Sequence, residues 1–274
     1  MSFQIGKGVA IGRGAGTSTS IRIGRYTPQV VPFTPTDIAG CIGWFDMQDA
    51  TAYTTVSGAV SAIINKASNV TWSQSTAANR PTYTASGINS LPCMTLDGVN
   101  DTIISSESAV YTALKDTSAY TIFYVAQITD LNAIEVIFGV GNSTNTTIGT
   151  RRWGTTNTGG GKWSNNNTND ASSVFTASSS GATNTNANVF EWFSPGTTVS
   201  LSVNGAAADP NAASCNPGTL TPNNSAIGCR PSSVLGSFYK GKLGELLIYN
   251  NNVSSTDRST IRSWLGSKWG ITVS

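Results

Sequence analysis

The chain has no histidine and few charged residues. Its 274 residues include 16 Lys and Arg and 14 Asp and Glu, and charged residues make up 11% of the total. Without histidine there can be no Ser-His-Asp or Cys-His nucleophile pair and no His-ligated metal. The formal net charge of +2 gives no strong field for nucleic acid, so we expect no nucleic-acid partner.

Long apolar runs are also missing. No window approaches the 18 consecutive apolar residues that indicate a transmembrane helix, so we expect no membrane partner. The first residues, MSFQIGKGVAIGRG, lack the apolar stretch of a signal peptide, and no classical secretion signal is expected there.

The four cysteines have no CxxC spacing that would indicate a zinc site. Cys41 and Cys93 lie in apolar, strand-like runs and are predicted to be small buried hydrophobic residues. Cys215 and Cys229 flank a loop rich in proline and asparagine. The sequence is compatible with a disulfide between these two and with two free thiols.

Small neutral polar residues dominate instead. The chain has 35 Ser, 36 Thr, 24 Asn and 28 Gly, so its surface must consist mostly of hydroxyls, amides and bare backbone. Valine, isoleucine and aromatic residues between Gly, Asn and Pro turns favour an all-β domain. The predicted strands are 41–46, 59–65, 92–97, 119–128, 134–140, 188–193, 198–205 and 242–250.

Turns and a helix complete this expected domain. Asp97-Gly98 and Asn204-Gly205 are tight-turn dipeptides, and regular strand spacing with such turns predicts an antiparallel two-sheet sandwich. The polar segment 141–187 is either a long surface excursion or a set of short polar edge strands. A helix is expected from a capping box at 254–257 to a stop at Gly270, with its apolar stripe at Ile261, Trp264 and Leu265.

Residues 1–36 differ from the rest of the chain. They carry four basic residues and no acid, a charge of +4, whereas residues 37–274 carry −2. Glycine at this density does not favour a helix, and a repeated Ile-Gly phrase suits extended chain lying on another surface. We therefore expect an anchoring arm and linker at 1–36 and a folded domain at 37–274; a disordered terminus is the alternative. The arm residues expected to make contact are Ile5, Lys7, Ile11, Arg13, Arg22, Ile23 and Arg25.

Several phrases occur in an order that resembles a known family. They are GWFDMQDA, AANRPTYTASGINSLPCMTLDGVNDTI, AYTIFYVAQ, VSLSVNGA, GKLGELLIYN and SSTDRSTIRSWLGSKWGI, spanning roughly 41–271. Together they resemble the laminin-G-like branch of the concanavalin A-like lectin/glucanase superfamily, in the versions found in bacteriophage virion proteins. The resemblance implies an all-β, antiparallel two-sheet jelly-roll sandwich, with members that include sugar binders, adhesion modules, virion decorations and some glycosidases.

Catalysis is not expected. Glycosidases need two carboxylates across a sugar, and the Glu-x-Asp-x-x-Glu strand of the family's hydrolases does not occur here. Glu135, Glu191 and Glu245 each stand alone in a strand. Of these, Glu191 beside Trp192 is the one that could face a concave groove.

A calcium site is a second possibility to weigh. Asp97, Asn100 and Asp101 in LDGVNDT offer oxygen ligands suited to Ca²⁺, which laminin-G-like domains often bind at a sandwich rim. The other interpretation is a tight turn in which these side chains bond the local backbone. The scarcity of acids favours the turn, and apart from this calcium site we expect no cofactor.

Sugar binding would use aromatic rings surrounded by amides. Trp153 and Trp163 lie in the polar segment near Arg151, Arg152 and Lys162, and these five residues are the candidate carbohydrate site. The alternative is that both tryptophans pack on the sheet. The periodic runs typical of a core contain four other tryptophans, Trp44, Trp192, Trp264 and Trp269. For Trp72 the sequence does not decide between the core and the surface.

The leading hypothesis is a non-enzymatic bacteriophage virion protein, either a capsid decoration or a tail or fibre component. The arm would anchor it to capsid, tail or sibling subunits, and the lectin-like domain would face outward on the particle surface. A homo-oligomer is expected, a trimer by analogy with fibres. The alternative is a carbohydrate-binding adhesin module that acts outside the cell on surface glycans.

Overall fold

The computed structural model describes residues 32–115, 119–129, 135–143, 150–155, 164–168, 174–178, 184–196, 198–207 and 222–274, and only the backbone in 150–155, 164–168 and 174–178. Contacts divide the chain into Met1–Pro32 and Phe33–Ser274, and the second unit is the subject below. The seven arm residues predicted to make contact lie outside the described residues, so the anchoring arm stays a prediction.

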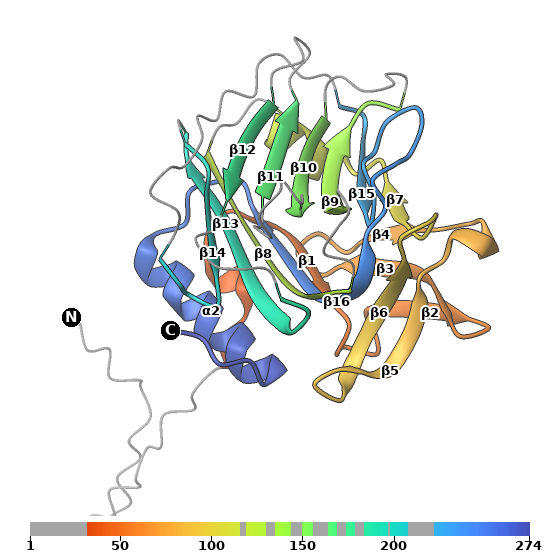
Figure 1. Cartoon of the computed structure of the whole chain (residues 1–274), viewed down its shortest axis with the longest axis horizontal. Helices are drawn as coiled ribbons and strands as arrows, with labels where there is room; N and C mark the ends of the chain where they lie inside the picture. The colour runs from red at the N-terminus through yellow and green to blue at the C-terminus, as the bar shows by residue number, and fades with distance from the viewer. Residues whose placement is uncertain are drawn as a thin grey trace, which may run out of the picture. The chain divides into compact units, whose positions relative to one another are not determined.

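The unit Phe33–Ser274 is built from antiparallel strands that form a strongly curled sheet (Figure 1). This arrangement confirms the expected jelly-roll-like β-sandwich with a C-terminal helix. Among the described residues the hydrogen-bonded order is β12-β11-β10-β9-β15-β7-β4-β3-β5-β6-β16-β8-β13-β14, while β1 pairs with β16 and β2 with β3. The strands are β1 (Cys41–Asp46), β2 (Tyr53–Val56), β3 (Ala59–Asn65), β4 (Val70–Ser73), β5 (Thr82–Ile88), β6 (Leu91–Asp97), β7 (Ile103–Ser105), β8 (Ala119–Ile128), β9 (Glu135–Gly141), β10 (Thr150–Thr155), β11 (Ser164–Thr168), β12 (Val174–Ser178), β13 (Ala187–Pro195), β14 (Ser200–Val203), β15 (Asn224–Ile227) and β16 (Lys240–Tyr249).

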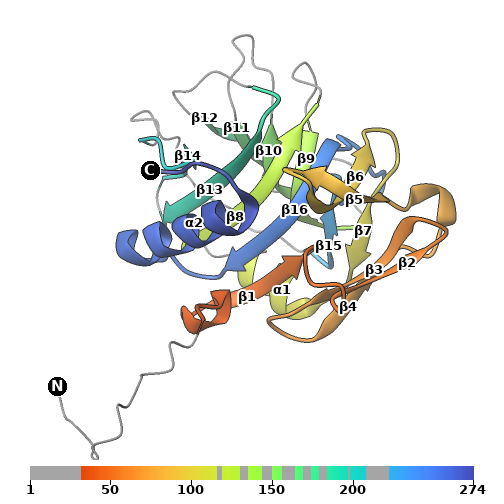
Figure 2. The same ribbon diagram turned by 90° about the horizontal axis from the view of Figure 1, so that it is seen from below.

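Strand β8 is the centre of one layer. It pairs with β13 on one side and β16 on the other, and its residues 120–126 are all buried. Both faces are covered because helix α2 (Ser255–Trp269) packs against β13 and β8 on the outer side (Figure 2). The nearly continuous apolar run AYTIFYVAQI is therefore a strand buried on both faces, as its sequence predicts.

Aromatic rings fill the space inside the sandwich. Trp72 of β4 packs against Phe45 of β1, with ring centroids 4.6 Å apart, and against Phe138 of β9 at 6.4 Å. On β8, Tyr124 accepts a 2.8 Å hydrogen bond from the indole N–H of Trp192. Trp72 is fully buried and therefore belongs to the core. Burying a ring of this size contributes about 2–3 kcal/mol to stability.

In the polar segment between β9 and β13, the described residues 150–155, 164–168 and 174–178 form the short edge strands that are one of the two expected arrangements. Strands β10, β11 and β12 continue the sheet outward from β9, each paired antiparallel with its neighbour. Short polar strands with few apolar residues fit the edge of a sheet, where one side lacks a partner strand.

Helix α2 begins and ends as its sequence predicts. The hydroxyl of Ser254 accepts a hydrogen bond from the backbone N–H of Asp257 at 3.1 Å, and Gly270 ends the helix with a left-handed φ of 64°. Ile261, Leu265 and Trp269 are its buried stripe. A second helix, α1 (Ser108–Lys115), has only two buried apolar residues and was not predicted.

The compact unit includes residues that precede Asp37. The ring of Phe33 meets Trp264 of α2 edge-on at 5.7 Å, and the backbone oxygen of Pro35 accepts a hydrogen bond from the Tyr249 hydroxyl at 3.0 Å. A short 3-10 helix, η1 (Pro35–Asp37), leads into β1. These contacts fix the chain from Phe33 onward.

Three of the cysteines are free thiols. Cys93 and Cys229 are buried and Cys41 is half-buried. Burial raises the pKa of Cys229 to about 12, so this thiol behaves as a small apolar group beside the Thr102 hydroxyl. Cys215 lies outside the described residues.

Within the described part of the chain, none of the helices combines the length and apolar character needed to cross a membrane.

Candidate functional site

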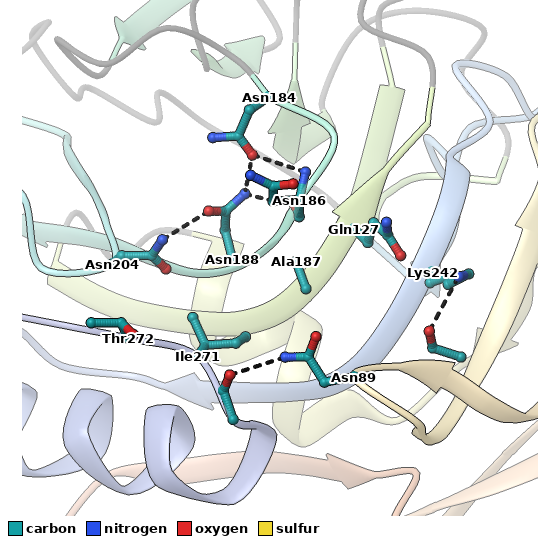
Figure 3. Close-up of a pocket in the computed structure, with 12 residues that line it drawn as sticks. Asn89, Gln127, Asn184, Asn186, Ala187, Asn188, Asn204, Lys242, Ile271 and Thr272 are labelled. Carbon is teal, nitrogen blue, oxygen red and sulfur yellow. Dashed lines mark hydrogen bonds between the residues drawn. The ribbon is translucent and has the colours of Figure 1, made fainter.

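A pocket of about 540 Å³ opens at the end of the sandwich where β8 finishes and β13 and β16 begin (Figure 3). The β5–β6 turn, the turn after β14 and the segment after α2 complete its walls. Its described lining is polar and rich in side-chain amides. The residues are Gly87, Asn89, Gln127, Asn184, Asn186, Ala187, Asn188, Asn204, Lys242, Gly270, Ile271 and Thr272.

One wall is made of asparagines at alternate positions. The side-chain amide of Asn188 donates to Asn184 Oδ1 at 3.0 Å and to the backbone oxygen of Asn186 at 2.9 Å. The backbone N–H of Asn186 also donates to Asn184 Oδ1, at 2.9 Å. This internal bonding fixes the chain as it enters β13 and holds the amides in place without a ligand.

The turn after β14 is tied to the same wall. Asn204 and Gly205 have φ values of 52° and 83°, as the Asn-Gly dipeptide predicts. Asn204 Oδ1 accepts from the Val189 N–H at 2.8 Å, and its Nδ2 donates to Asn188 Oδ1 at 2.8 Å. A Cβ on residue 205 would come within 2.0 Å of the Ser274 backbone oxygen, so glycine is required there.

The opposite wall places a cation beside an amide. Lys242 of β16 and Gln127 of β8 are direct partners across the two strands. The Lys242 ammonium donates to the Gly87 backbone oxygen at 3.2 Å, and Gln127 Nε2 donates to the Thr185 backbone oxygen at 2.9 Å. The buried Tyr239 hydroxyl lies 3.0 Å and 3.1 Å from the backbone oxygens of Gln127 and Lys242, which fixes the backbone behind them.

The floor of the pocket joins a hairpin to the end of α2. Asn89 and Ser90 adopt left-handed φ values of 47° and 66° between β5 and β6. Asn89 Nδ2 donates to the backbone oxygens of Trp269 at 2.8 Å and Gly270 at 3.1 Å, the carbonyls that the helix leaves unbonded. The segment that begins with Ile271 is thereby held beside the pocket.

Hydrogen-bonding capacity remains after these contacts. Among the described residues, no bond is formed by the side chain of Asn186, the Nδ2 group of Asn184 or the oxygens of Asn89 and Gln127. Amides offer donors and acceptors together, and this combination matches hydroxyl groups, which also donate and accept. The described lining has no aromatic ring, no carboxylate and no thiol.

The side chains of the carbohydrate site predicted from sequence lie outside the described part of the structure. Arg151, Arg152 and Trp153 lie on β10, opposite Val140, Gly139 and Phe138 of β9, and their side chains are outside the described residues. Lys162 and Trp163 are wholly outside them. The role of these five residues in carbohydrate binding stays a prediction.

The candidate calcium ligands form a tight turn. Asp97 Oδ1 accepts from the backbone N–H groups of Val99 at 2.8 Å, Asn100 at 3.2 Å and Asp101 at 3.4 Å. Asp101 Oδ2 accepts from the Asp97 N–H at 3.0 Å, and burial together with the Asp97 charge raises the pKa of Asp101 to about 6. The backbone bonds match the turn interpretation, and calcium binding here stays a prediction. Within the described residues, no group of three or more Cys, Asp or Glu could hold a metal ion.

The isolated glutamates serve other groups. Both oxygens of Glu191 are bound by arginines of α2, and Glu245 is bound by two indoles and a lysine. The idea that Glu191 faces an open groove is therefore wrong, because its carboxylate points into the contact between β13 and α2.

Sequence reasoning missed the pocket for an identifiable reason. The phrase NTNAN repeats asparagine at 184, 186 and 188, a period of two that places the side chains on one face of an extended chain. This spacing alone predicts a row of amides on one face. The meeting of this phrase with Lys242, Asn89 and Asn204 depends on strand order, which no local pattern contains.

Comparisons with known proteins support the fold of this chain but identify no family. No protein-family model matches the chain, and no curated protein matches it either. Among solved structures, a Trypanosoma rangeli sialidase in complex with sialic acid aligns at 13% identity and a TM-score of 0.54, over 85% of this chain and 34% of that one. This likeness shows a shared β-sandwich fold.

Two further structures are similar over less of the chain. A mutant NanB sialidase from Streptococcus pneumoniae aligns at 17% identity and a TM-score of 0.49, over 61% of this chain and 27% of that one. The Ruminococcus gnavus IT-sialidase CBM40 bound to α2,3-sialyllactose aligns at 16% identity and a TM-score of 0.48, over 62% of this chain and 95% of that one. The chain thus spans about a quarter to a third of the two larger sialidases.

Proposed function

We propose that the domain is a carbohydrate-binding, lectin-like module that binds a saccharide in the amide-lined pocket and does not hydrolyse it. The observation that carries this proposal is the pocket itself: about 540 Å³ lined by six side-chain amides and a lysine, held in place by their own hydrogen bonds. A volume of this size suits a mono- or disaccharide.

The chemistry of the lining favours a sugar over an apolar ligand. An apolar molecule would leave the Asn186 side chain, the Asn184 Nδ2 group and the Gln127 side-chain oxygen without partners, at a cost of about 1–3 kcal/mol for each polar group so buried. A saccharide replaces water at each amide with a hydroxyl that both donates and accepts. Prior fixation of Asn188 by its neighbours reduces the entropy lost on binding.

Asn186→Ala is expected to weaken saccharide binding about three- to tenfold without changing the melting temperature. The side chain is exposed and forms no bond to described residues, so its removal deletes one ligand contact and no fold contact. Glycan-array screening followed by titration calorimetry on the best ligand measures the change. Asn250→Ala, an exposed asparagine outside the pocket whose side chain also forms no bond to described residues, is the matched control. Unchanged affinity in Asn186→Ala and no array binding by the wild type would both count against the proposal.

Trp153 and Trp163 give the proposal a second candidate contact. A glycan that extends to the strands beyond β9 would stack on these rings, with Arg151, Arg152 and Lys162 next to them in the sequence. Loss of array binding in Trp153→Ala or Trp163→Ala, with pocket variants unaffected, would move the site to that segment.

A virion role is the second candidate function. It is supported by the charge of +4 on residues 1–36 against −2 on the remainder and by the repeated Ile-Gly phrase, which suit an arm that adds to a partner's sheet edge. In this proposal the lectin-like domain is displayed by a capsid or tail assembly as a homo-oligomer.

Deleting residues 1–30 is then expected to leave a folded β domain that no longer incorporates into particles. Circular dichroism measures the fold, and co-sedimentation with particles measures incorporation. Incorporation at the wild-type level would contradict the anchoring role while leaving carbohydrate binding unaffected.

A further inference from the structure

The pocket contains one charged side chain among its described residues, the lysine at position 242. No carboxylate of the described lining faces it. The described lining therefore presents a single positive charge surrounded by neutral amides, and this local charge does not follow from the chain's overall balance of +2.

Four other basic residues on this sandwich are matched with acids, whereas Arg80, Arg230 and Lys240 form no ion pair with a described residue. Lys66 pairs with Asp46 and Asp49, Arg258 and Arg262 with Glu191, and Lys268 with Asp46 and Glu245, at distances of 2.6–3.3 Å. Lys242, although half-buried, forms no ion pair with any described residue. An ammonium that is partly withdrawn from water without a counter-charge favours an anion from outside.

The hydrogen bonding of Lys242 leaves room for that anion. An ammonium has three N–H donors, and the bond to the Gly87 backbone oxygen at 3.2 Å uses one of them. Gln127, the cross-strand partner of Lys242, lies beside it, and the asparagines face them across the cavity (Figure 3). A ligand anchored at the ammonium by an acidic group would thus extend its hydroxyls toward the amide wall.

We propose that the saccharide bound in this pocket is acidic, and that its carboxylate or sulfate group binds the Lys242 ammonium. This inference rests on the proposed carbohydrate-binding function and names the class of sugar. A carboxylate and a sulfate both present anionic oxygens on a sugar ring. The experiment below distinguishes a carboxylated sugar from a sulfated one.

The test compares three matched probes on the wild-type chain by titration calorimetry. They are a neutral disaccharide, the same disaccharide with one hydroxymethyl group oxidised to a carboxylate, and its sulfate ester at that position. We expect at least one charged probe to bind about tenfold or more tightly than the neutral one. We also expect its affinity to fall as salt is raised, because ions screen the attraction.

Variants assign the preference to one side chain. Lys242→Gln should bring the charged probe down to the affinity of the neutral one, and Lys242→Arg should keep most of the preference. Lys240→Gln removes the same charge from an exposed position on the same strand and should change neither affinity. Melting temperatures measured beside each titration confirm that the variants are folded.

The outcomes separate this inference from the proposed function. Equal binding of all three probes by the wild type, or a charge preference that survives in Lys242→Gln, overturns the acidic-ligand inference and leaves a pocket for neutral sugars. Failure of every probe, together with an array that shows no binding, overturns both.

Discussion

Replacing Glu191 with alanine is expected to destabilise the domain by about 3–5 kcal/mol. Glu191 lies in the middle of β13 and its side chain is 3% exposed. Its Oε1 accepts from Arg258 Nε at 2.7 Å and its Oε2 from Arg262 Nη1 at 2.7 Å. One buried carboxylate therefore binds two arginines spaced four residues apart on one face of α2.

The expected cost comes from what alanine leaves behind. Arg258 and Arg262 are about 15% exposed in this position, so both guanidinium groups would lose their counter-charge without regaining full hydration. Arg258 also donates to the Val253 backbone oxygen and Arg262 to that of Ser274, and these bonds hinder the arginines from turning outward. We expect the whole packing contact between α2 and β13 to become less stable, because both of its ion pairs are lost together.

Urea unfolding followed by circular dichroism measures the change in the free energy of unfolding. Asp49→Asn is the matched control, because Asp49 forms a 2.6 Å ion pair with Lys66 but its side chain is 29% exposed, where such pairs contribute about 1 kcal/mol or less. Arg258→Ala should cost less than Glu191→Ala, since Glu191 keeps its second arginine. A loss below about 1 kcal/mol in Glu191→Ala would mean that this ion-pair cluster adds little to stability.

Local patterns of the sequence predict much of this fold. The apolar run at 119–128, the Asn-Gly turn at 204–205 and the capped helix ending at Gly270 each depend on residues within a few positions of one another. Their bounds in the structure agree closely with the expected ones. Helix α1 does not follow from its local sequence, because eight residues with two buried apolar side chains give no clear helical period.

The site could not be predicted in the same way. Asn89, Gln127, Asn188 and Lys242 come from four separate strands or turns, and they meet only because β16 lies between β6 and β8 and β13 lies beside β8. In the sequence, tryptophans in a polar segment favour a sugar site because aromatic rings stack on sugars. The described pocket instead depends on amides, which are abundant along the whole chain and so stand out only once they converge.

The partners of isolated glutamates likewise do not follow from the local sequence. Glu245 and Glu107 are both isolated acids in the sequence, Glu245 in an apolar strand and Glu107 among serines. In the structure Glu107 accepts from the indole of Trp72 at 2.6 Å and from the hydroxyl of Ser68 at 2.6 Å. Both glutamates therefore satisfy buried donors from other elements, and nothing in the local sequence names those donors.

Stability is expected to rise as pH falls from 8 to 5, through Glu245. The side chain of Glu245 is fully buried on β16, and a bulge at Gly244 brings it beneath α2. Burial raises the pKa of Glu245 from its ordinary 4.5 to about 7, although the Lys268 ammonium at 2.8 Å lowers it. The folded protein thus holds a proton at pH values where the unfolded chain has lost it.

The direction of the effect follows from that difference. Folding takes up a proton between pH 4.5 and 7, so the stabilising contribution of protonated Glu245 is complete below pH 4.5 and is lost as pH rises through 7. Between pH 8 and 5 the free energy of unfolding should increase by an amount on the order of a few kcal/mol. Asp49, whose pKa its bonds with Lys66 lower to about 2, does not titrate in this range.

Glu245→Gln separates this group from every other source of pH dependence. Glutamine keeps an oxygen for the indole N–H of Trp44 or Trp269 but carries no titrating proton. Urea unfolding at several pH values should show the wild type gaining stability over Glu245→Gln as pH falls from 8 to 5, while Asp49→Asn stays parallel to the wild type. A constant difference between wild type and Glu245→Gln across that range would mean that the carboxylate stays ionised, held by Lys268 and the two indoles strongly enough to offset its burial.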